Sequence, residues 1–431
     1  MFRLRRTIVR KHSQGLRSAS RGWLAGLLAL CVWFRCAADA QADGPPPAPE
    51  PSSPHVEAPG PLLGFDVFVD GEAIHLLLEV PGDAPESAQA VHRVSRDGGR
   101  TWSAPVRVDQ GADVPLRVKH GSEPQLAFRG ETGVAAWTAI GTGFMKRGPA
   151  TAAWTTDGGR TWKPGPPPCP TGTRNSQAFL DLAVDAGGRF HLVWLDGRTD
   201  PRTSYSASST GPDAGWSSPS VIDGAACACC WNRLTVGGDG SVYLAYRDDV
   251  PRDMGVAVWE PAGAAWRSLG RAGAFDWRVD GCPHVGGGIV ESLGPRGCTL
   301  HAVVWTARED AVGLYLVSCA PDRGVWTAPV RIGSKTAKHA DLAFAGGRLV
   351  CAWDAWMAPD DPSAVFVAES ADGGATWSEP MRLSPPGIAS SFPRVVRVGG
   401  RRLVFFARED PGGARLEGPV DSALAGSGKR E

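Results

Sequence analysis

Five residues with sulfur or imidazole side chains lie in two short segments of the 431-residue chain. The segments read C-A-C-C and G-C-P-H, and they supply Cys227, Cys229, Cys230, Cys282 and His284. Thiolates and imidazoles bind copper(I) or zinc, whereas cysteines in an oxidising compartment form disulfides. The spacing is not the C-x-x-C of a zinc ribbon. Three alternatives stay open: disulfides that staple loops, a Cys/His metal site, and a redox-active pair of adjacent cysteines.

Charged turns follow three apolar segments. R-D-D begins at Arg247, and A-R-E-D places an arginine at Arg308 and again at Arg408. A guanidinium can bind a carboxylate through two parallel hydrogen bonds, so converging arginines would suit an acidic ligand. The alternative is that each arginine pairs with the acidic residues of its own turn and only closes a loop.

Short strands are the elements expected to position these turns and loops. Gly (55) and Pro (36) are abundant, which fits many tight turns and excludes a helical bundle. Apolar segments rich in β-branched and aromatic residues, with no sustained helical period, predict the strands. These segments are 75–80, 134–140, 190–196, 242–248, 300–306, 349–354 and 403–408.

A repeat of 50–60 residues organises the strands. Three octets end in Trp, at Ser95–Trp102, Thr155–Trp162 and Ser370–Trp377, and weaker copies end at Trp216, Trp266 and Trp326. Repeats of this length predict a solenoid or a propeller. Three strands, an octet and a fourth strand make one four-stranded propeller blade. There are seven strand units but six Trp-terminated ones, so we expect residues near 55–63 to supply the missing strand. The count favours seven blades over six.

The octets resemble the Asp box, or BNR repeat, of the sialidase (neuraminidase) superfamily. The resemblance implies an all-β, sialidase-like propeller and a structural role for the box residues Asp97, Trp102, Asp157, Trp162, Asp372 and Trp377. Each Asp carboxylate is expected to accept backbone N–H bonds and hold its loop. Each Trp is expected to bury its ring between neighbouring sheets.

The resemblance also implies a catalytic site. Sialidases bind the substrate carboxylate with three arginines and use a Tyr nucleophile with a Glu, plus an Asp acid/base. The residues that match by position are Arg247, Arg308 and Arg408 with their neighbours Tyr246, Asp248, Glu309 and Glu409. The implied function is an exo-glycosidase on acidic, sialic-acid-type glycans that requires no cofactor. The alternative is a non-catalytic propeller that binds a glycan, a protein or, through the Cys/His residues, copper or zinc.

The C-x-C-C and G-C-P motifs are similar to those of exported bacterial sialidase-like proteins of unassigned function. Export also fits the N-terminus, where a basic segment precedes 12 apolar residues (23–34) and an A-x-A sequence (38–40). We therefore predict a signal peptide (1–40), a Pro-rich spacer (41–60), the propeller (61–418) and a disordered tail (419–431). The expected location is periplasmic or extracellular, with no membrane span after cleavage.

Two further predictions come from charge and cysteine spacing. Lys plus Arg (45) equal Asp plus Glu (45), which argues against a nucleic-acid binder. The resemblance to sialidases implies a glycan or small acidic ligand as the partner. Cys298 and Cys319 lie symmetrically about the turn at Ala307–Asp310. This spacing places them opposite each other across two antiparallel strands, so we predict a disulfide between them.

Overall fold

The computed structural model describes residues 55–84, 87–112, 116–117, 122–142, 147–169, 176–294 and 297–425. The predicted signal peptide and most of the predicted spacer lie outside these residues. The chain divides into two units, Met1–Glu50 and Pro51–Glu431, and the second holds all the described structure. No helix in the described residues is long and apolar enough to cross a membrane.

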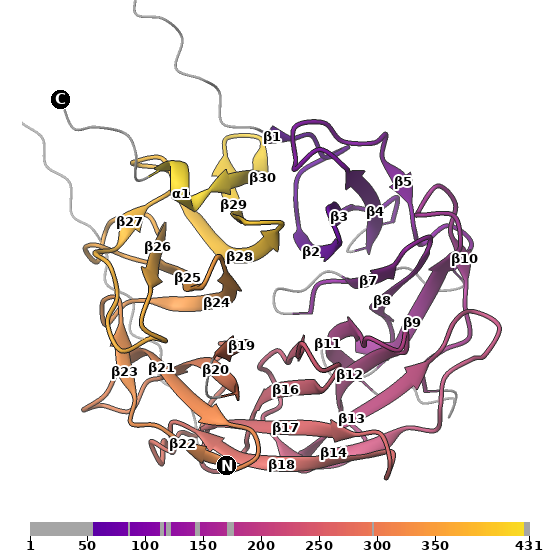
Figure 1. Ribbon diagram of the computed structural model, residues 1–431. Coiled ribbons are helices and arrows are strands. Elements are labelled where there is room, and N and C mark those ends of the chain that lie inside the picture. Colours follow the sequence, from indigo (N-terminus) through magenta and orange to yellow (C-terminus); the bar gives the residue numbers. More distant parts are fainter. Residues whose placement is uncertain are drawn as a thin grey trace, which may run out of the picture. The chain divides into compact units, whose positions relative to one another are not determined.

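The second unit is an all-β propeller of seven blades (Figure 1). Each blade begins with its innermost strand, and neighbouring innermost strands contact one another in a closed ring. These strands are β2 (Gly64–Asp70), β7 (Gln125–Arg129), β11 (Gln177–Val184), β15 (Arg233–Val236), β19 (Gly288–Gly294), β24 (Lys338–Ala345) and β28 (Ser390–Val398).

The remaining strands continue each blade outward in antiparallel order. The second strands are β3 (Ala73–Pro81), β8 (Thr132–Ile140), β12 (Phe190–Asp196), β16 (Val242–Arg247), β20 (Gly297–Thr306), β25 (Arg348–Ala355) and β29 (Arg401–Asp410). The third strands are β4 (Ser87–Ser95), β9 (Arg147–Thr155), β13 (Arg202–Ser209), β17 (Met254–Glu260), β21 (Gly313–Ala320), β26 (Ala364–Ser370) and β30 (Gly413–Asp421). The outer strands are β5 (Val106–Arg107), β10 (Lys163–Pro164), β14 (Ser220–Ala226), β18 (Ala265–Ala272), β22 (Val325–Trp326) with β23 (Val330–Ile332), β27 (Met381–Arg382) and β1 (His55–Val56).

The first strand of the chain closes the ring. β1 pairs with β30, so that His55 lies opposite Glu417 and Val56 opposite Leu416. This confirms the expectation that the N-terminal stretch completes the last blade, and it fixes the number of blades at seven. Closure covers the edge of β30, and the edge strand β1 that remains is short. The folded part is longer than the expected 61–418, because β1 starts at His55 and β30 is followed by the short helix α1 (Ser422–Ala425).

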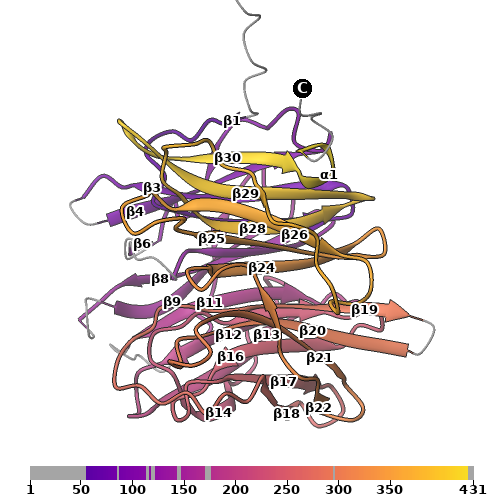
Figure 2. The same ribbon diagram turned by 90° about the vertical axis from the view of Figure 1, so that its left-hand side faces the viewer.

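The core lies between adjacent blades and not within any single sheet. One cluster, for example, joins Trp305 and Leu316 of the fifth blade to Leu349 and Trp353 of the sixth. Figure 2 shows the blades from the side. One link, β6 (Leu116–Arg117), pairs with both β4 and β8 and joins the first two blades into one sheet.

The octet loops carry the expected hydrogen bonds. In the first loop, Asp97 Oδ1 accepts the N–H groups of Arg100 and Thr101 at 3.0 and 2.9 Å, and Oδ2 accepts the Thr101 hydroxyl at 2.6 Å. The Thr101 bonds come first among the causes that hold the pKa of Asp97 well below its usual value. Trp102 packs edge-on against Phe405 of the last blade, with ring centroids 6.4 Å apart. The Asp97 bonds hold the loop itself, and the Trp102 ring contacts the neighbouring blade.

The predicted disulfide between Cys298 and Cys319 is wrong. Both cysteines are free, because Cys319 lies opposite Leu300 in the β20–β21 register, two residues from Cys298. The last pair before the turn is Thr306 with Gly313, so the turn is longer than the symmetric one assumed. The Cys298 Sγ instead lies 2.7 Å from Glu291 Oε1.

Candidate functional site

Arg247, the first of the three expected arginines, is a buried cross-blade donor. It is 2 % exposed and donates to the carbonyls of Val285, Arg252 and Trp305 at 3.2, 2.5 and 3.0 Å. Its guanidinium also lies 5.4 Å from the centroid of the Trp277 ring. All three acceptors are backbone oxygens that the fold holds in place.

Tyr246 and Asp248 lie toward the outer edge of the propeller. The Tyr246 hydroxyl donates to Asp223 on the outer strand β14 at 2.8 Å, and Asp248 binds Arg271 on the outer strand β18 at 2.7 Å. These four residues line a peripheral groove. Burial, ahead of the charge of Asp223, raises the pKa of Tyr246 well above its usual value. The structure therefore separates this Tyr from the central channel.

The other two arginines pair within their own turns. Arg308 binds Asp310 at 2.7 Å and donates to the Phe275 carbonyl at 2.6 Å. Arg408 binds Asp410 at 3.1 Å and also Glu417 at 2.8 Å.

The acidic neighbours of these arginines differ in position. Glu309 is exposed on its turn, whereas Glu409 lines a pocket at one mouth of the central channel. Of the seven candidate catalytic residues, only Glu409 lines this pocket.

A ring of charged side chains crosses the central channel. It consists of Asp66, Asp181, Arg233, Asp341 and Arg394, one from each of five innermost strands, and we call it the polar ring. Arg394 binds Asp66 at 3.1 Å and Asp341 at 3.3 Å, while Arg233 lies 3.8 Å from Asp181. Arg233 and Arg394 line pockets on both sides of the ring, so the ring forms the floor between the two halves of the channel.

Each aspartate of the polar ring also binds the next blade. Asp66 accepts the Leu126 N–H at 3.0 Å, Asp181 the Leu234 N–H at 2.5 Å, and Asp341 the Val395 N–H at 2.9 Å. Burial raises the pKa of Asp181 to about 6, against the opposing charges of Arg233 and Arg394.

Bulges in three innermost strands build the mouth above the ring. The register shifts in β11, β24 and β28, where Phe179, His339 and Phe392 take positive φ of 57°, 46° and 55°. Such backbone strain costs about 1–3 kcal/mol per residue and tends to occur at functional sites. Hydrogen bonds offset this strain at two of the bulges: the Phe179 N–H donates to Ser122 Oγ at 3.1 Å, and the Phe392 N–H donates to Asp354 Oδ2 at 2.9 Å.

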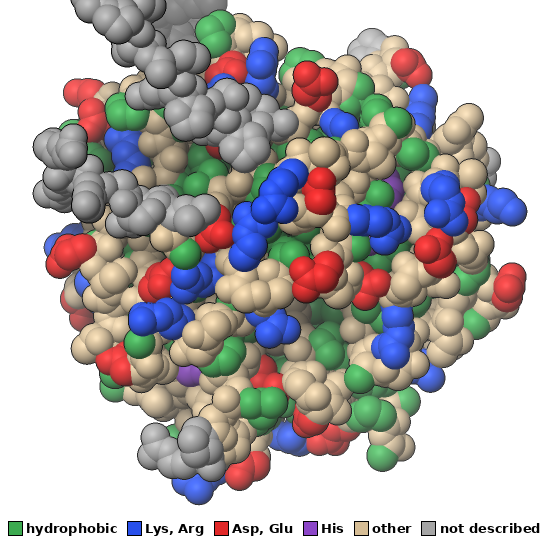
Figure 3. All heavy atoms as spheres, turned by 45° about the horizontal axis from the view of Figure 1, so that its top comes forward, with side chains coloured by type: hydrophobic (Ala, Val, Ile, Leu, Met, Phe, Trp, Pro, Cys, Tyr) green, Lys and Arg blue, Asp and Glu red, His purple; other side chains and the backbone are tan. Residues whose placement is uncertain are grey.

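The resulting cavity, the mouth pocket, has a volume of about 200 Å³. It combines aromatic surfaces with carboxylates, an imidazole and the two arginines of the ring. Its lining includes Phe65, Glu123, Trp231, Asn232, Arg233, His339, Asp341, Phe392, Arg394 and Glu409. On the face drawn in Figure 3, basic and acidic side chains are interspersed, in keeping with the zero net charge.

His339 is the residue of the mouth pocket best equipped for proton transfer. Its Nδ1 lies 2.9 and 3.0 Å from the two carboxylate oxygens of buried Asp354. Because a carboxylate only accepts, Nδ1 carries the hydrogen, and Nε2 is the ring nitrogen left to face a ligand. The ring stands between Phe392 and Trp231, at centroid distances of 4.6 and 5.7 Å. A His oriented by an Asp is a common general base.

Sequence reasoning missed His339 and Trp231 as site residues. His339 lies on β24 and Trp231 in the loop before β15, and neither belongs to the turns matched by resemblance. The available signal was a Phe or His two positions before a charged residue, as in Phe179 to Asp181 and His339 to Asp341.

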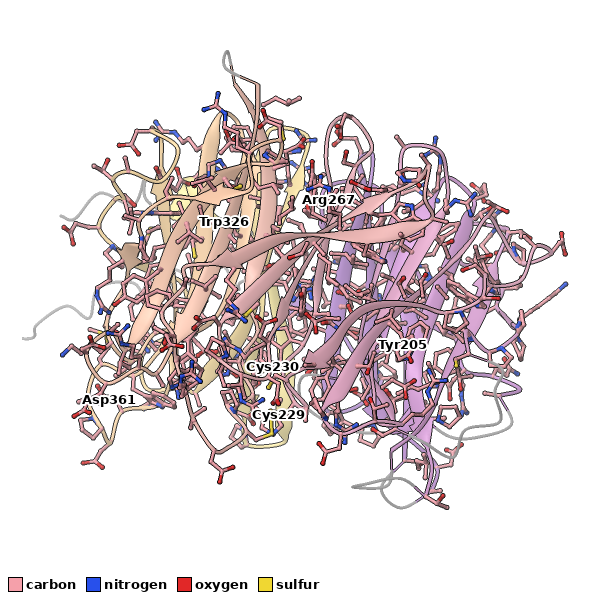
Figure 4. The ribbon with its side chains drawn as sticks, turned by 90° about the horizontal axis from the view of Figure 1, so that it is seen from below. Tyr205, Cys229, Cys230, Arg267, Trp326 and Asp361 are labelled. Carbon is pink, nitrogen blue, oxygen red and sulfur yellow. A yellow bond between two sulfur atoms is a disulfide. The ribbon has the colours of Figure 1, made fainter. Side chains whose placement is uncertain are left out.

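The cysteine-rich loop flanks the mouth pocket. Cys229 and Cys282 form a disulfide with a Cα–Cα distance of 6.0 Å, which bears out the loop-staple alternative for this pair. Cys227 and Cys230 are free thiols, and the Cys227 Sγ lies 3.6 Å from Cys230 Sγ and 3.8 Å from Cys229 Sγ. In Figure 4, Cys229, Cys230 and Asp361 lie toward one face, and Arg267 and Trp326 toward the other.

Comparison with known proteins supports the fold. No family model and no curated protein matches the chain. A solved polysaccharide lyase of family PL25, an ulvan lyase bound to a GlcA–Rha3S unit, matches with a TM-score of 0.56 and 9 % identity over 88 % of this chain and 98 % of its own. YCF48 bound to D1 peptide matches with a TM-score of 0.50 and 16 % identity over 85 % and 94 %. The Hadza microbial sialidase Hz136 matches with a TM-score of 0.46 and 15 % identity over 79 % and 75 %. At these identities the matches to the lyase and to YCF48 show a similar overall fold and nothing finer.

Proposed function

We propose that the protein binds a glycan in the mouth pocket and cleaves it with His339 as the group that moves the proton. The observation that carries the proposal is the His339–Asp354 pair, held between Trp231 and Phe392 on the wall of a concave polar pocket. Aromatic faces pack on sugar rings, and carboxylates accept hydrogen bonds from hydroxyls. Glu123 and Glu409 bring carboxylates to the same pocket and are candidates for the partner acid.

The charges favour a neutral glycan over a sialic acid. Three carboxylates line the mouth pocket, at Glu123, Asp341 and Glu409, against the two guanidiniums of Arg233 and Arg394. Arg394 is already bound to Asp66 and Asp341. The sialic-acid form of the proposal would need other arginines to leave their present partners and meet at one carboxylate.

The test is turnover of a panel of fluorogenic glycosides, with neutral sugars, a glucuronide and a sialoside as separate arms. His339→Gln is expected to lower kcat/KM by about 10²–10⁴, the usual contribution of a general acid or base. His191→Gln is the matched control, because His191 forms a similar pair with Asp185 at 3.0 Å and does not line the mouth pocket.

Three outcomes distinguish cleavage from binding alone and a neutral glycan from a sialoside. Turnover that falls in His339→Gln but not in His191→Gln supports the proposal. Glycan binding without turnover of any of the glycosides would refute the cleavage part of the proposal and support the binding part. Turnover of the sialoside alone, abolished by Arg408→Ala, would refute the neutral-glycan assignment.

We also propose that the protein is exported, as the N-terminal sequence predicts. Cell fractionation and N-terminal sequencing test this, with a mature chain starting near residue 41 as the expected result. A chain that keeps its first 40 residues would refute cleavage.

A further inference from the structure

Four cysteine sulfurs meet where two loops pack beside the mouth pocket. Cys227, Cys229 and Cys230 lie in the loop between β14 and β15, and Cys282 lies between β18 and β19. The Sγ atoms of the first three lie within 4.8 Å of one another. Cys229, Cys282 and the imidazole of His284 form a second group within the same distance.

The ligand chemistry of the first group is that of a soft cation. It offers three sulfurs and no oxygen ligand, and its residues belong to an apolar cluster with Ala226, Leu244 and Tyr246. Soft thiolate ligands suit copper(I) and zinc, but a structural zinc site is closed by four protein ligands and this group offers three, so copper(I) fits it better. In the oxidised chain, however, Cys229 is bonded to Cys282 and offers no thiolate.

The solvent exposure of the two disulfide-bonded cysteines decides which sulfur a reductant can attack. Cys227, Cys229 and Cys230 are only 1, 3 and 1 % exposed, whereas Cys282 lies on the surface. An external thiol can therefore reach the disulfide at the Cys282 sulfur. Attack there releases Cys229, the buried partner, as the leaving thiolate.

We propose that reduction of the Cys229–Cys282 disulfide by a dithiol opens a copper(I) site formed by Cys227, Cys229 and Cys230. One thiolate of the reductant attacks Cys282 Sγ, the protein S–S bond breaks, and Cys229 departs as a thiolate. The second thiol of the reductant then attacks the mixed disulfide and releases Cys282. The protein gains two electrons and the reductant becomes a disulfide. Copper(I) then replaces the protons of the three thiols and keeps its oxidation state.

His284 helps to keep the site together after reduction. Its Nδ1 lies 2.9 Å from the Cys229 carbonyl oxygen, a bond that joins the two loops independently of the disulfide. Cys227 N–H also donates to the Arg247 carbonyl at 2.8 Å. The three sulfurs therefore remain on an anchored loop when the S–S bond is broken.

The experiment measures copper(I) binding to the full chain in two redox states. Half of the purified protein is reduced anaerobically with dithiothreitol and desalted, and both halves compete with bicinchoninate for copper(I). Thiol counts in denaturant report the state of the disulfide. We expect about one tightly held copper(I) per reduced chain and at least about tenfold less in the oxidised chain. The Cys282→Ser variant, which cannot form the disulfide, should bind copper(I) without reduction.

The controls separate the site from general thiol binding. Cys230→Ser should lose the copper(I), while Cys351→Ser should retain it, because Cys351 is a buried free thiol on β25 in another blade. Circular dichroism of each variant checks that it is folded. If Cys230→Ser were unfolded, Cys227→Ser would serve in its place.

Three results would overturn the proposal. Equal copper(I) binding by oxidised and reduced chains would refute the redox gate. Equal binding by reduced wild type and Cys230→Ser would refute the site. Tight zinc(II) binding with no competing copper(I) binding would refute the choice of metal. None of these results depends on whether the mouth pocket cleaves glycans.

Discussion

Replacing Arg394 with methionine should expose the electrostatic cost of the polar ring. Arg394 is the only described partner that binds both Asp66 and Asp341, at 3.1 and 3.3 Å. Methionine keeps much of the side-chain volume but removes the charge. Both carboxylates would remain in place, because each also accepts a backbone N–H from the next blade.

The expected loss follows from the burial of the three groups. Breaking a buried ion pair by removing one partner costs about 3–5 kcal/mol. The Arg394 side chain is 18 % exposed, so water can reach part of the site and the lower end of the range, about 3 kcal/mol, is expected at pH 7. The cost should shrink on acidification, since an unpaired carboxylate that takes up a proton no longer carries a buried charge. One carboxylate contributes at most about 1.4 kcal/mol per pH unit to this change.

Urea denaturation followed by Trp fluorescence measures the effect, because the chain has 17 Trp. Arg308→Met is the matched control: the Arg308 and Asp310 side chains are 46 and 65 % exposed, and such pairs contribute about 1 kcal/mol or less. The double variant Arg394→Met/Asp66→Asn should recover part of the loss. The reasoning is refuted if Arg394→Met and Arg308→Met lose equal stability at pH 7, or if the cost of Arg394→Met is the same at pH 5 and pH 7.

Three further variants test separate parts of the structure. Burial raises the pKa of Asp181 in the folded protein to about 6, so its ionisation lowers the stability of the fold as pH rises from about 4 to 6. Asp181→Asn removes this loss and should gain up to about 3 kcal/mol relative to wild type across that pH range. A difference in urea midpoints that does not change with pH would contradict this. Val56→Asp places a charge where β1 closes the ring at 4 % exposure and should lower the melting temperature clearly, whereas Val325→Asp, at 73 %, should not; equal shifts would argue against closure by β1. A Cβ on Gly286 would lie 2.1 Å from Trp231 Nε1, so Gly286→Ala should displace that ring and weaken glycan binding, as measured by titration. Gly224→Ala, whose added Cβ would meet no atom within 4 Å, should leave glycan affinity unchanged.

The fold was predictable because its signals are local. Each octet supplies its own Asp, Gly and Trp, and the loop around Asp97 depends on residues within four positions of it. Ring closure followed from a count, since a blade without its fourth strand needs one from the other end of the chain. The β20–β21 turn was less predictable: a shift of two residues separates Cys298 from Cys319, and no local signal sets that register.

The site was harder to predict because its geometry is not local. Two of the three matched arginines pair within their own turns, Arg308 with Asp310 and Arg408 with Asp410, which was the alternative weighed from sequence. Arg247 instead donates to backbone carbonyls, among them those of Val285 and Trp305. The side chains that meet in the channel come from five blades, and bulges in three innermost strands decide which residue faces inward. A bulge shifts a strand by one residue and so exchanges its two faces. Sequence alternation therefore does not reveal that His339 lines the mouth pocket.

The cysteine loop and the mouth pocket share Trp231, and this couples the two proposals physically. Trp231 follows Cys230 directly, lines the mouth pocket and lies against Gly286, four residues beyond Cys282. The disulfide, together with the contact between His284 Nδ1 and the Cys229 carbonyl, holds the two segments between which the Trp231 ring is placed. If reduction lets these segments move, glycan affinity should fall in the reduced chain and recover when copper(I) draws the three sulfurs together. Cys282→Ser should then bind glycan weakly without the metal and normally with it. Affinity unchanged by reduction would mean that packing against Gly286 alone positions Trp231, and the two sites would be independent.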